Sequence, residues 1–265
     1  MAKKELIKKE QAVPVKKELM DELLDSGYTG FENVDNDSLQ IPFLKMAQPT
    51  SVQVNEDDPA YIKGLKPGCF YNSITNKNYG KSINVIALGY YRLFIEWEEG
   101  GSAPVNTYTP EELEKVVSRG EVQKDSYQYT SSEGNSIKDT RYFFVSLPDF
   151  PEDGVILFPL SSTSIGHAKK WLTKASMIVS SDGKKQYPLF ASIWKLETAY
   201  NENEKGKWYT LGNKKSTLIT HNGFVTKQLL DVVKTQLTLV KGYLNNVHAI
   251  NYAEVETAAQ EEIGF

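Results

Sequence analysis

Short apolar runs, separated by glycine, proline and asparagine, dominate the chain from Ile41 to Leu211. The clearest of these runs are 68–72, 83–88, 90–97, 140–147 and 154–160. Short runs rich in Val, Ile, Phe and Tyr and bounded by turn residues are typical of β-strands. The pattern therefore predicts a mainly β domain over this part of the chain.

The run 90–97 divides into two faces, because successive side chains of a strand point to opposite sides. One face holds Tyr91, Leu93, Ile95 and Trp97 and reads as a core face. The other holds Tyr90, Arg92, Phe94 and Glu96. Two rings beside an arginine are unusual for a merely solvated surface. Gly89, just before this run, predicts a bulge or a sharp bend.

Three segments show helical signals. The clearest is Val225 to Leu244, whose apolar stripe predicts a helix packed on the sheet. A second follows the hydroxyl residues 161–164, which suit a helix start. In it Ile165, Ala168, Leu172 and Ala175 share one face, while His167, Lys170 and Lys174 form a stripe with Trp171 at its edge. A short helix is expected over 111–120.

A β-hairpin is predicted around the polar segment NENEKG, with strands over 190–198 and 206–211. These strands carry Trp194 and Trp208, each beside a lysine. Together with the basic helix before it, this hairpin combines positive charge with flat aromatic surface. Such a combination suits a ligand that has phosphates and exposed bases.

The expected fold class is mainly β (α+β), an OB-like partly open barrel with helical additions. Barrels of this kind bind oligonucleotides on one strand face and its loops. The expected domains are a mobile N-terminal arm over 1–36, an OB-like DNA-binding domain over 37–245, and a disordered acidic tail over 246–265. The polar insertion over 100–135 receives no functional assignment.

Charge is distributed unevenly along the chain, although the net charge is only −4. Residues 159–245 carry thirteen lysines and five acids, whereas residues 246–265 carry four glutamates and no base. A basic segment followed by an acidic tail is a hint of function. Neither a membrane span nor a signal peptide is recognisable. With Cys69 as the single cysteine, we expect a cytoplasmic protein without a disulfide.

Catalytic motifs are absent or incomplete. Gly80-Lys81-Ser82 lacks the earlier glycine of a phosphate-binding loop and precedes a predicted strand. The three histidines are scattered, with no ligand spacing. We therefore expect no catalytic residue, no metal and no cofactor. Carboxylates do gather at Glu96, Glu98, Glu99 and at Asp149, Glu152, Asp153, so a metal-dependent nuclease remains an alternative.

Proteins bind single-stranded nucleic acid with lysines and arginines, which neutralise phosphates, and with aromatic rings, which stack on unpaired nucleobases. Adjacent rings and basic residues recur in five separate segments of this chain. The candidate DNA-binding residues are Tyr90, Arg92, Phe94, Arg141, Tyr142, Phe144, Lys170, Trp171, Lys174, Trp194, Lys195, Lys207, Trp208 and Tyr209.

The tail offers a second candidate site, for a protein partner. Glu261, Glu262, Ile263 and Phe265 combine charge with an aromatic side chain. Phe265 would fill an apolar pocket on the partner while the carboxylates meet Lys or Arg at its rim. Alternatively, the tail would cover the protein's own basic groove when no DNA is bound.

The tail sequence QEEIGF resembles the acidic tip of bacterial single-stranded DNA-binding proteins, with Gly264 where those proteins have proline. Four other segments resemble a family of tailed-phage single-stranded DNA-binding proteins. These are IPFLKMAQPTS, the block from PGCFYN to LFIEW, LSSTSIGHAKKWL and PLFASIWKLETAYNENEKGKWYTL. This resemblance implies an OB-like core and a role in phage replication or recombination.

The sequence thus favours a non-enzymatic, phage-encoded protein that coats single-stranded DNA. The expected partners are single-stranded DNA and phage or host replication or recombination proteins that bind the tail. A homo-oligomer stays open, and no membrane is expected. The alternatives are a strand-annealing recombination protein, the nuclease, and a structural or host-interaction protein.

Overall fold

The computed structural model describes residues 40–98, 104–125, 128–204, 206–213, 215–245 and 247, all within one unit that begins at Gln40. Its eight-stranded antiparallel sheet runs in the order β13 (Ile219–Phe224), β10 (Ser192–Glu197), β4 (Ser82–Trp97), β8 (Ser136–Ser146), β7 (Gln128–Ser131), β6 (Val122–Asp125). β5 (Pro104–Tyr108) also pairs with β4, and β9 (Val155–Ser161) also pairs with β8.

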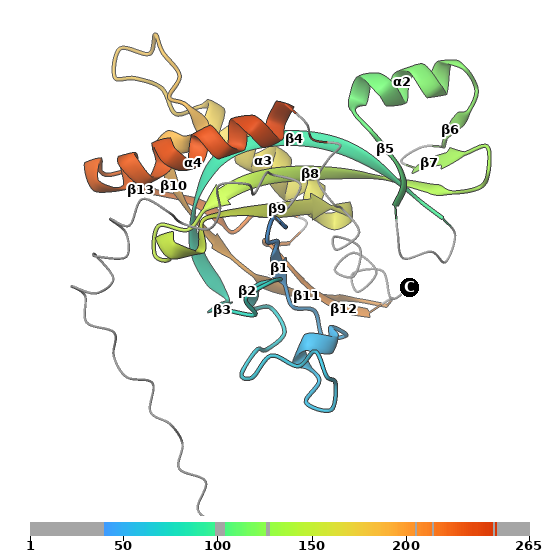
Figure 1. The fold of residues 1–265 in the computed structure, drawn as a ribbon, viewed down its shortest axis with the longest axis horizontal. Helices are drawn as coiled ribbons and strands as arrows, with labels where there is room; N and C mark the ends of the chain where they lie inside the picture. The colour runs from blue at the N-terminus through green and yellow to red at the C-terminus, as the bar shows by residue number, and fades with distance from the viewer. Residues whose placement is uncertain are drawn as a thin grey trace, which may run out of the picture. The chain divides into compact units, whose positions relative to one another are not determined.

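Within the described residues, two smaller sheets and three α-helices accompany the large sheet (Figure 1). The first small sheet contains β1 (Leu44–Met46), β2 (Phe70–Asn72) and β3 (Asn78–Gly80). The second contains β11 (Ala199–Asn203) and β12 (Gly206–Thr210). The helices are α2 (Pro110–Ser118), α3 (Ile165–Ser176) and α4 (Lys227–Asn245), with short 3₁₀ turns at Val52–Val54, Pro151–Asp153, Ser162–Ser164 and Leu189–Ala191.

Strand β4 connects all parts of the large sheet. Its first half pairs with β10 and its last residues with β5, while β8 follows most of its other edge. The register with β8 shifts between Ala87 and Gly89, which confirms the predicted bulge. The alternation predicted for 90–97 is confirmed as well, because Tyr91, Leu93, Ile95 and Trp97 all join one hydrophobic cluster.

Helices α3 and α4 pack on opposite faces of this sheet. Val233 and Val240 of α4 join the cluster of Leu93 and Ile95, as predicted for this helix. A Cβ atom on Gly89 would lie only 2.9 Å from Val240 Cγ1, so the glycine allows α4 to approach the bulge closely.

On the other face, Trp171 of α3 stacks on Phe143 of β8 with ring centroids 4.3 Å apart. Trp171 also meets the edge of Trp194 of β10. The buried face of α3 therefore contains His167 and Trp171 together with Ala168 and Ala175. Sequence periodicity predicts Leu172 on this face instead of Trp171. The larger ring occupies the centre because it removes more apolar surface from water.

The far ends of β4 and β8 carry a lobe made of β5, α2, β6 and β7 (Figure 1, right). Its core consists of Phe94, Leu113, Val116, Val122 and Ile137. Helix α2 starts with a capping box, in which Thr109 accepts from the Glu112 N–H and the Glu112 carboxylate accepts from the Thr109 N–H. The described part of the insertion over 100–135 is therefore folded around the extension of β4.

These pairings confirm a mainly β, α+β chain, but they do not establish an OB barrel. The predicted hairpin is wrong in one respect. Strand β10, with Trp194, belongs to the large sheet, and β12, with Trp208, pairs with β11. Within the described residues, none of the helices combines the length and the apolar character that a membrane span requires.

Candidate nucleic-acid interface

A polar strip crosses the α3 face of β4 and β8 between the core and the lobe. Tyr90 and Arg92 of β4 and Asp139 and Arg141 of β8 form it, and we name it the arginine strip. Arg92 pairs with Asp139 through Nε to Oδ1 at 2.8 Å and Nη2 to Oδ2 at 2.6 Å. Arg141 donates to Asp139 Oδ2 at 3.2 Å and to the Tyr90 hydroxyl at 2.8 Å. One carboxylate thus orients two guanidinium groups.

The strip keeps a net positive charge, because two arginines share one aspartate. The hydrogen bond to Asp139 outweighs partial burial and raises the pKa of Arg92, which stays charged. Its guanidinium carbon lies 4.4 Å from the ring centroid of Phe94, and 32% of its side chain is exposed, against 11% for Arg141. Arg92 is therefore the member that a ligand can reach, with its plane fixed by a carboxylate and a ring.

A cleft of about 670 Å³ opens beside the strip, between the lobe and the start of α3. We name it the β8 cleft. It exists because β7 pairs with β8 at Ser136 and Ile137, whereas β9 pairs with β8 only from Thr140 onward. Its walls are Gln128, Tyr129, Thr130, Ser136, Ile137, Lys138, Asp139, Ser161, Ser162, Thr163, Ile165 and Lys169.

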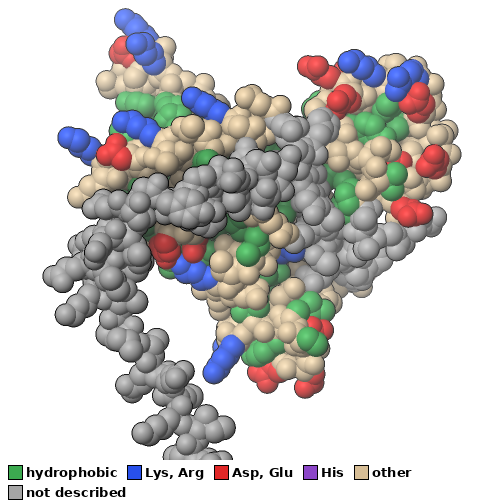
Figure 2. Space-filling view, in the orientation of Figure 1, with side chains coloured by type: hydrophobic (Ala, Val, Ile, Leu, Met, Phe, Trp, Pro, Cys, Tyr) green, Lys and Arg blue, Asp and Glu red, His purple; other side chains and the backbone are tan. Residues whose placement is uncertain are grey.

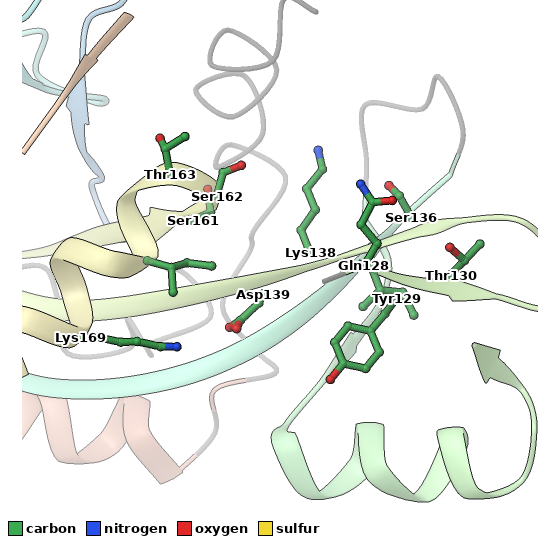
Figure 3. A pocket seen from close by; sticks show the side chains of 12 residues that line it. Gln128, Tyr129, Thr130, Ser136, Lys138, Asp139, Ser161, Ser162, Thr163 and Lys169 are labelled. Atoms are coloured by element: carbon green, nitrogen blue, oxygen red, sulfur yellow. The ribbon is translucent and has the colours of Figure 1, made fainter. Parts of the chain in front are cut away.

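Figure 3 shows how the charged side chains enter this cleft from different elements. Lys138 and Asp139 are neighbours on β8 and point to opposite faces of the strand, as in any strand. Lys169 comes from α3, and Ser162 and Thr163 come from the turn before it. Lysines and hydroxyl groups therefore line the cleft. Asp139, one of the four residues of the arginine strip, lines it as well.

This arrangement provides hydrogen-bond donors for the phosphates of a nucleic acid and an aromatic ring on which a nucleobase can stack. Lysine and arginine neutralise phosphates, and hydroxyls donate to phosphate oxygens. Tyr129 lines the cleft half-buried, with its ring edge-on to Phe94 at 5.4 Å. An unpaired base can stack on an aromatic ring or on a guanidinium plane.

Five candidate rings lie in the core instead. Phe94, Tyr142, Phe144, Trp171 and Trp194 are each at most 2% exposed. A base cannot stack on a ring whose faces are already covered, unless the core opens. Burying these rings stabilises the sheet and its helices. The candidate interface therefore does not include them as stacking surfaces for bases.

The candidate lysines next to those rings lie in separate places. Lys174 donates to the Ile219 carbonyl at 2.6 Å and thereby ties α3 to β13. Lys170 is exposed, with Nζ 3.5 Å from the Lys215 carbonyl oxygen. Lys195 of β10 lies 3.0 Å from Glu197. None of these three lines the β8 cleft.

The candidates on β12 belong to the small β11–β12 sheet. Lys207 is exposed and lies 3.6 Å from Glu202. Trp208 is half-buried. Tyr209 packs its ring against Gly68, and its backbone is held by Gln48 through hydrogen bonds of 2.8 and 3.1 Å. Tyr209 therefore attaches the hairpin to the rest of the fold.

Sequence reasoning located Tyr90, Arg92 and Arg141 but missed Tyr129, Lys138 and Lys169. Tyr129 lies in the insertion that carried no assignment. The sequence pattern places the basic stripe of α3 on His167, Lys170 and Lys174 and so leaves out Lys169, whereas in the fold His167 is buried. The alternation of Gln128–Ser131 was the available signal for Tyr129, but nothing in the sequence brings it to β8.

Three of the acidic residues proposed for a nuclease, Glu96, Asp149 and Asp153, have other partners. Buried Glu96 accepts from Asn106 (2.9 Å), Tyr108 (2.7 Å) and Asn135 (2.9 Å). Burial opposes its ionisation, but these hydrogen bonds together lower the pKa of Glu96. Asp153 binds Lys77, and Asp149 accepts from Asn84.

No three His, Cys, Asp or Glu side chains of the described segments gather closely enough to hold a metal ion. The partner-binding candidates Glu261, Glu262, Ile263 and Phe265 fall outside the described segments, and so does Glu99.

A family model described as Pam3 phage gp34-like protein matches residues 8–243. No curated protein and no solved structure matches the chain.

Proposed function

The chain belongs to the Pam3 phage gp34-like protein family, and from this premise we propose that it is a phage protein that binds single-stranded DNA without catalysing a reaction. The proposed binding surface is the arginine strip together with the β8 cleft. The observation that best supports this proposal is the hydrogen-bonded network of Arg92, Asp139 and Arg141. It lies beside a cleft lined by Lys138, Lys169 and Tyr129.

Three properties of this surface support the binding of a single strand. It combines half-buried rings with basic groups, and stacking on rings requires unpaired bases. Arg92 is held rigidly by Asp139, so little side-chain freedom is lost on binding. The β8 cleft lies between a lobe and a helix, where a flexible strand can enter. The proposed binding mode resembles that of OB-type barrels, in which strand faces and loops hold the DNA.

The wider role follows from the same proposal. Such a protein would coat phage single strands in the host cytoplasm. The acidic segment ending Glu261–Phe265 would recruit phage or host replication or recombination proteins.

The test compares binding of a fluorescent oligo-dT strand and of a duplex of the same length, by fluorescence anisotropy at low and high salt. We expect strand-selective, salt-sensitive binding by the wild-type protein. Lys169→Glu should weaken binding by about tenfold or more, because it replaces a phosphate contact with a repulsion. Arg92→Lys should weaken it too, because lysine keeps the charge but loses the planar, bidentate geometry.

Lys63→Glu is the matched control, since Lys63 is an exposed lysine on the loop between β1 and β2. It should leave oligo-dT affinity nearly unchanged. Equal losses for Lys63→Glu and Lys169→Glu would mean that only overall charge matters, and would remove the β8 cleft from the proposal. Absence of binding to either DNA form would end the proposal. Faster pairing of two complementary strands would instead favour the annealing alternative.

A further inference from the structure

Helix α4 repeats one pattern three times along its length. Lys227, Lys234 and Lys241 recur every seven residues, and each is followed three residues later by a leucine, namely Leu230, Leu237 and Leu244. Residues seven apart lie on the same side of a helix, and residues three apart are surface neighbours. The three lysines are exposed and the three leucines are half-buried. Leu237 and Leu244 pack on the hydrophobic cluster on this face of the sheet. α4 thus carries a row of three lysines beside an apolar row. Asp231 lies among the lysines, with its Oδ1 3.7 Å from Lys234 Nζ, so the row keeps a net positive charge.

A small apolar hollow lies at the start of this helix. Its volume is about 270 Å³, and its walls are Tyr187, Phe190, Ala191, Phe224, Val225 and Leu230. Phe224 and Tyr187 are exposed by 51% and 42%, which is unusual for large apolar side chains. A cavity below the usual size of a small-molecule site suits the side chains of a peptide.

The surroundings of the hollow are basic. Lys184 and Lys185 are exposed in the turn that precedes Tyr187, and Lys227 opens α4. In Figure 2, basic side chains follow α4, and hydrophobic surface lies between this helix and the turn. An acidic peptide with a bulky apolar end would therefore match both the charge and the shape of this face.

The same chain contains such a peptide. The segment from His248 to Phe265 contains Glu254, Glu256, Glu261 and Glu262 but no Lys or Arg, and its last bulky side chains are Ile263 and Phe265. The 18 residues from His248 to Phe265 reach at most about 60 Å when extended. Helix α4 spans only about 28 Å, so the segment is long enough to run back along the whole helix.

We propose that the segment Glu254–Phe265 docks on its own chain, with its glutamates along Lys241, Lys234 and Lys227 and with Ile263 and Phe265 in the hollow beside Phe224. This inference goes beyond the proposed function, because it concerns a contact made without DNA. A partner that binds the same segment would have to displace it from α4.

A nucleic-acid strand fits this face less well. The rings of Tyr187 and Phe224 are inclined at 57° and those of His221 and Phe224 at 69°. Tilted rings packed on one another offer no flat platform for successive bases. The hollow between them is apolar, which suits an aliphatic or aromatic side chain.

The test is zero-length carbodiimide cross-linking of the full chain, without DNA, followed by mass spectrometry. Equal amounts of ¹⁴N-labelled and ¹⁵N-labelled protein are mixed, so that links within one chain can be told from links between two. We expect Glu254, Glu256, Glu261 and Glu262 to link to Lys227, Lys234 and Lys241 within single chains. The links should largely disappear at 1 M salt, where the Debye length is about 3 Å.

Two variants separate the hollow from the general charge attraction. Phe224→Ala and Phe265→Ala should each reduce the yield of these links about tenfold, because an apolar side chain is no longer buried. Tyr200→Ala is the matched control, since Tyr200 is 47% exposed on β11. It should leave the yield unchanged.

Three results would overturn the inference. The first is an even spread of links over other exposed lysines such as Lys63 and Lys66. The second is links only between chains, which would mean that the segment docks on another copy. The third is wild-type yield in both phenylalanine variants. DNA is absent throughout, so failure here leaves the DNA-binding proposal standing, and failure of DNA binding leaves this one standing.

Discussion

Trp194 illustrates how one residue type serves two very different purposes. Beside Lys195 in the sequence it resembles a stacking platform for a base. In the fold it is 1% exposed and contacts the edges of Trp171 and His221. Its lysine neighbour points to the other side of β10, because alternate residues of a strand face opposite ways. Adjacency in sequence therefore separates the ring from the charge.

We predict that Trp194→Ala lowers the free energy of unfolding by about 3–5 kcal/mol, the usual cost of removing a large buried ring. Trp194→Phe should retain most of the wild-type free energy of unfolding, because a large buried ring remains. Urea denaturation followed by circular dichroism measures both. A Trp194→Ala protein with the wild-type midpoint but weakened oligo-dT binding would reassign this ring to the interface.

Glu96 shows how a buried carboxylate acts on the stability of the lobe. Its pKa is lowered in the folded chain relative to its ordinary value of 4.5. It therefore contributes stability above pH 4.5, and this contribution is lost as the pH falls through the lower folded pKa. We predict that Glu96→Gln is less stable than wild type at pH 7 and that the difference narrows toward pH 3.

Thermal unfolding of both proteins at several pH values measures this difference. Comparing the two proteins cancels the titration of the other carboxylates. A difference that stays constant from pH 7 to pH 3 would show that the charge of Glu96 does not matter.

At the scale of elements, the contact between α4 and β4 depends on Gly89. A Cβ atom there would lie 2.9 Å from Val240 and 3.2 Å from Leu244. Both neighbours belong to the packed face of α4, so an added methyl group would force these side chains or the helix to move. The bulge and the absence of a side chain at Gly89 together allow α4 to pack closely on β4.

We predict that Gly89→Ala lowers the free energy of unfolding by about 1–3 kcal/mol through overpacking. Gly166→Ala is the matched control, because a Cβ on Gly166 in α3 meets nothing within 4 Å. That change should be neutral or stabilising by up to about 1 kcal/mol, as for alanine in place of glycine in a helix. Denaturant titrations compare the two. Equal destabilisation would mean that α4 adapts to the added methyl group.

At the scale of the whole molecule, the β8 cleft joins elements distant in the sequence. The lobe contributes Tyr129, β8 contributes Lys138, and α3 contributes Lys169. Each is placed by a different part of the hydrophobic core. The net charge of the whole chain is −4, so attraction of a nucleic acid would depend on this local basic surface and not on the total charge.

For single strands, the logarithm of affinity falls with the logarithm of salt concentration, with a slope of about −0.7 per phosphate contact. We predict that Lys169→Ala makes this slope shallower by about 0.7. Anisotropy titrations at several salt concentrations measure it. A slope equal to that of wild type would show that Lys169 touches no phosphate.

Local patterns predicted much of the fold correctly. The alternation of 90–97, the bulge at Gly89, the helix over 225–244 and the stop of the short helix near Gly120 all rest on neighbours in sequence. The partner of β12 was misjudged because strand pairing is decided by distant residues. The candidate site was found only in part for the same reason, since Arg92 and Arg141 were recognised without Asp139, which holds them together.

The sequence by itself determined the strand and helix segments, the faces of β4 and the uneven charge, because these follow from the period of side chains along one segment. Only the tertiary structure decided which rings are buried, where Lys169 points and how β7 and β9 leave a cleft on β8. Those outcomes depend on contacts between segments far apart in the chain, which compete for the same core. A strand's pattern shows which face is apolar, but the packing decides what covers that face.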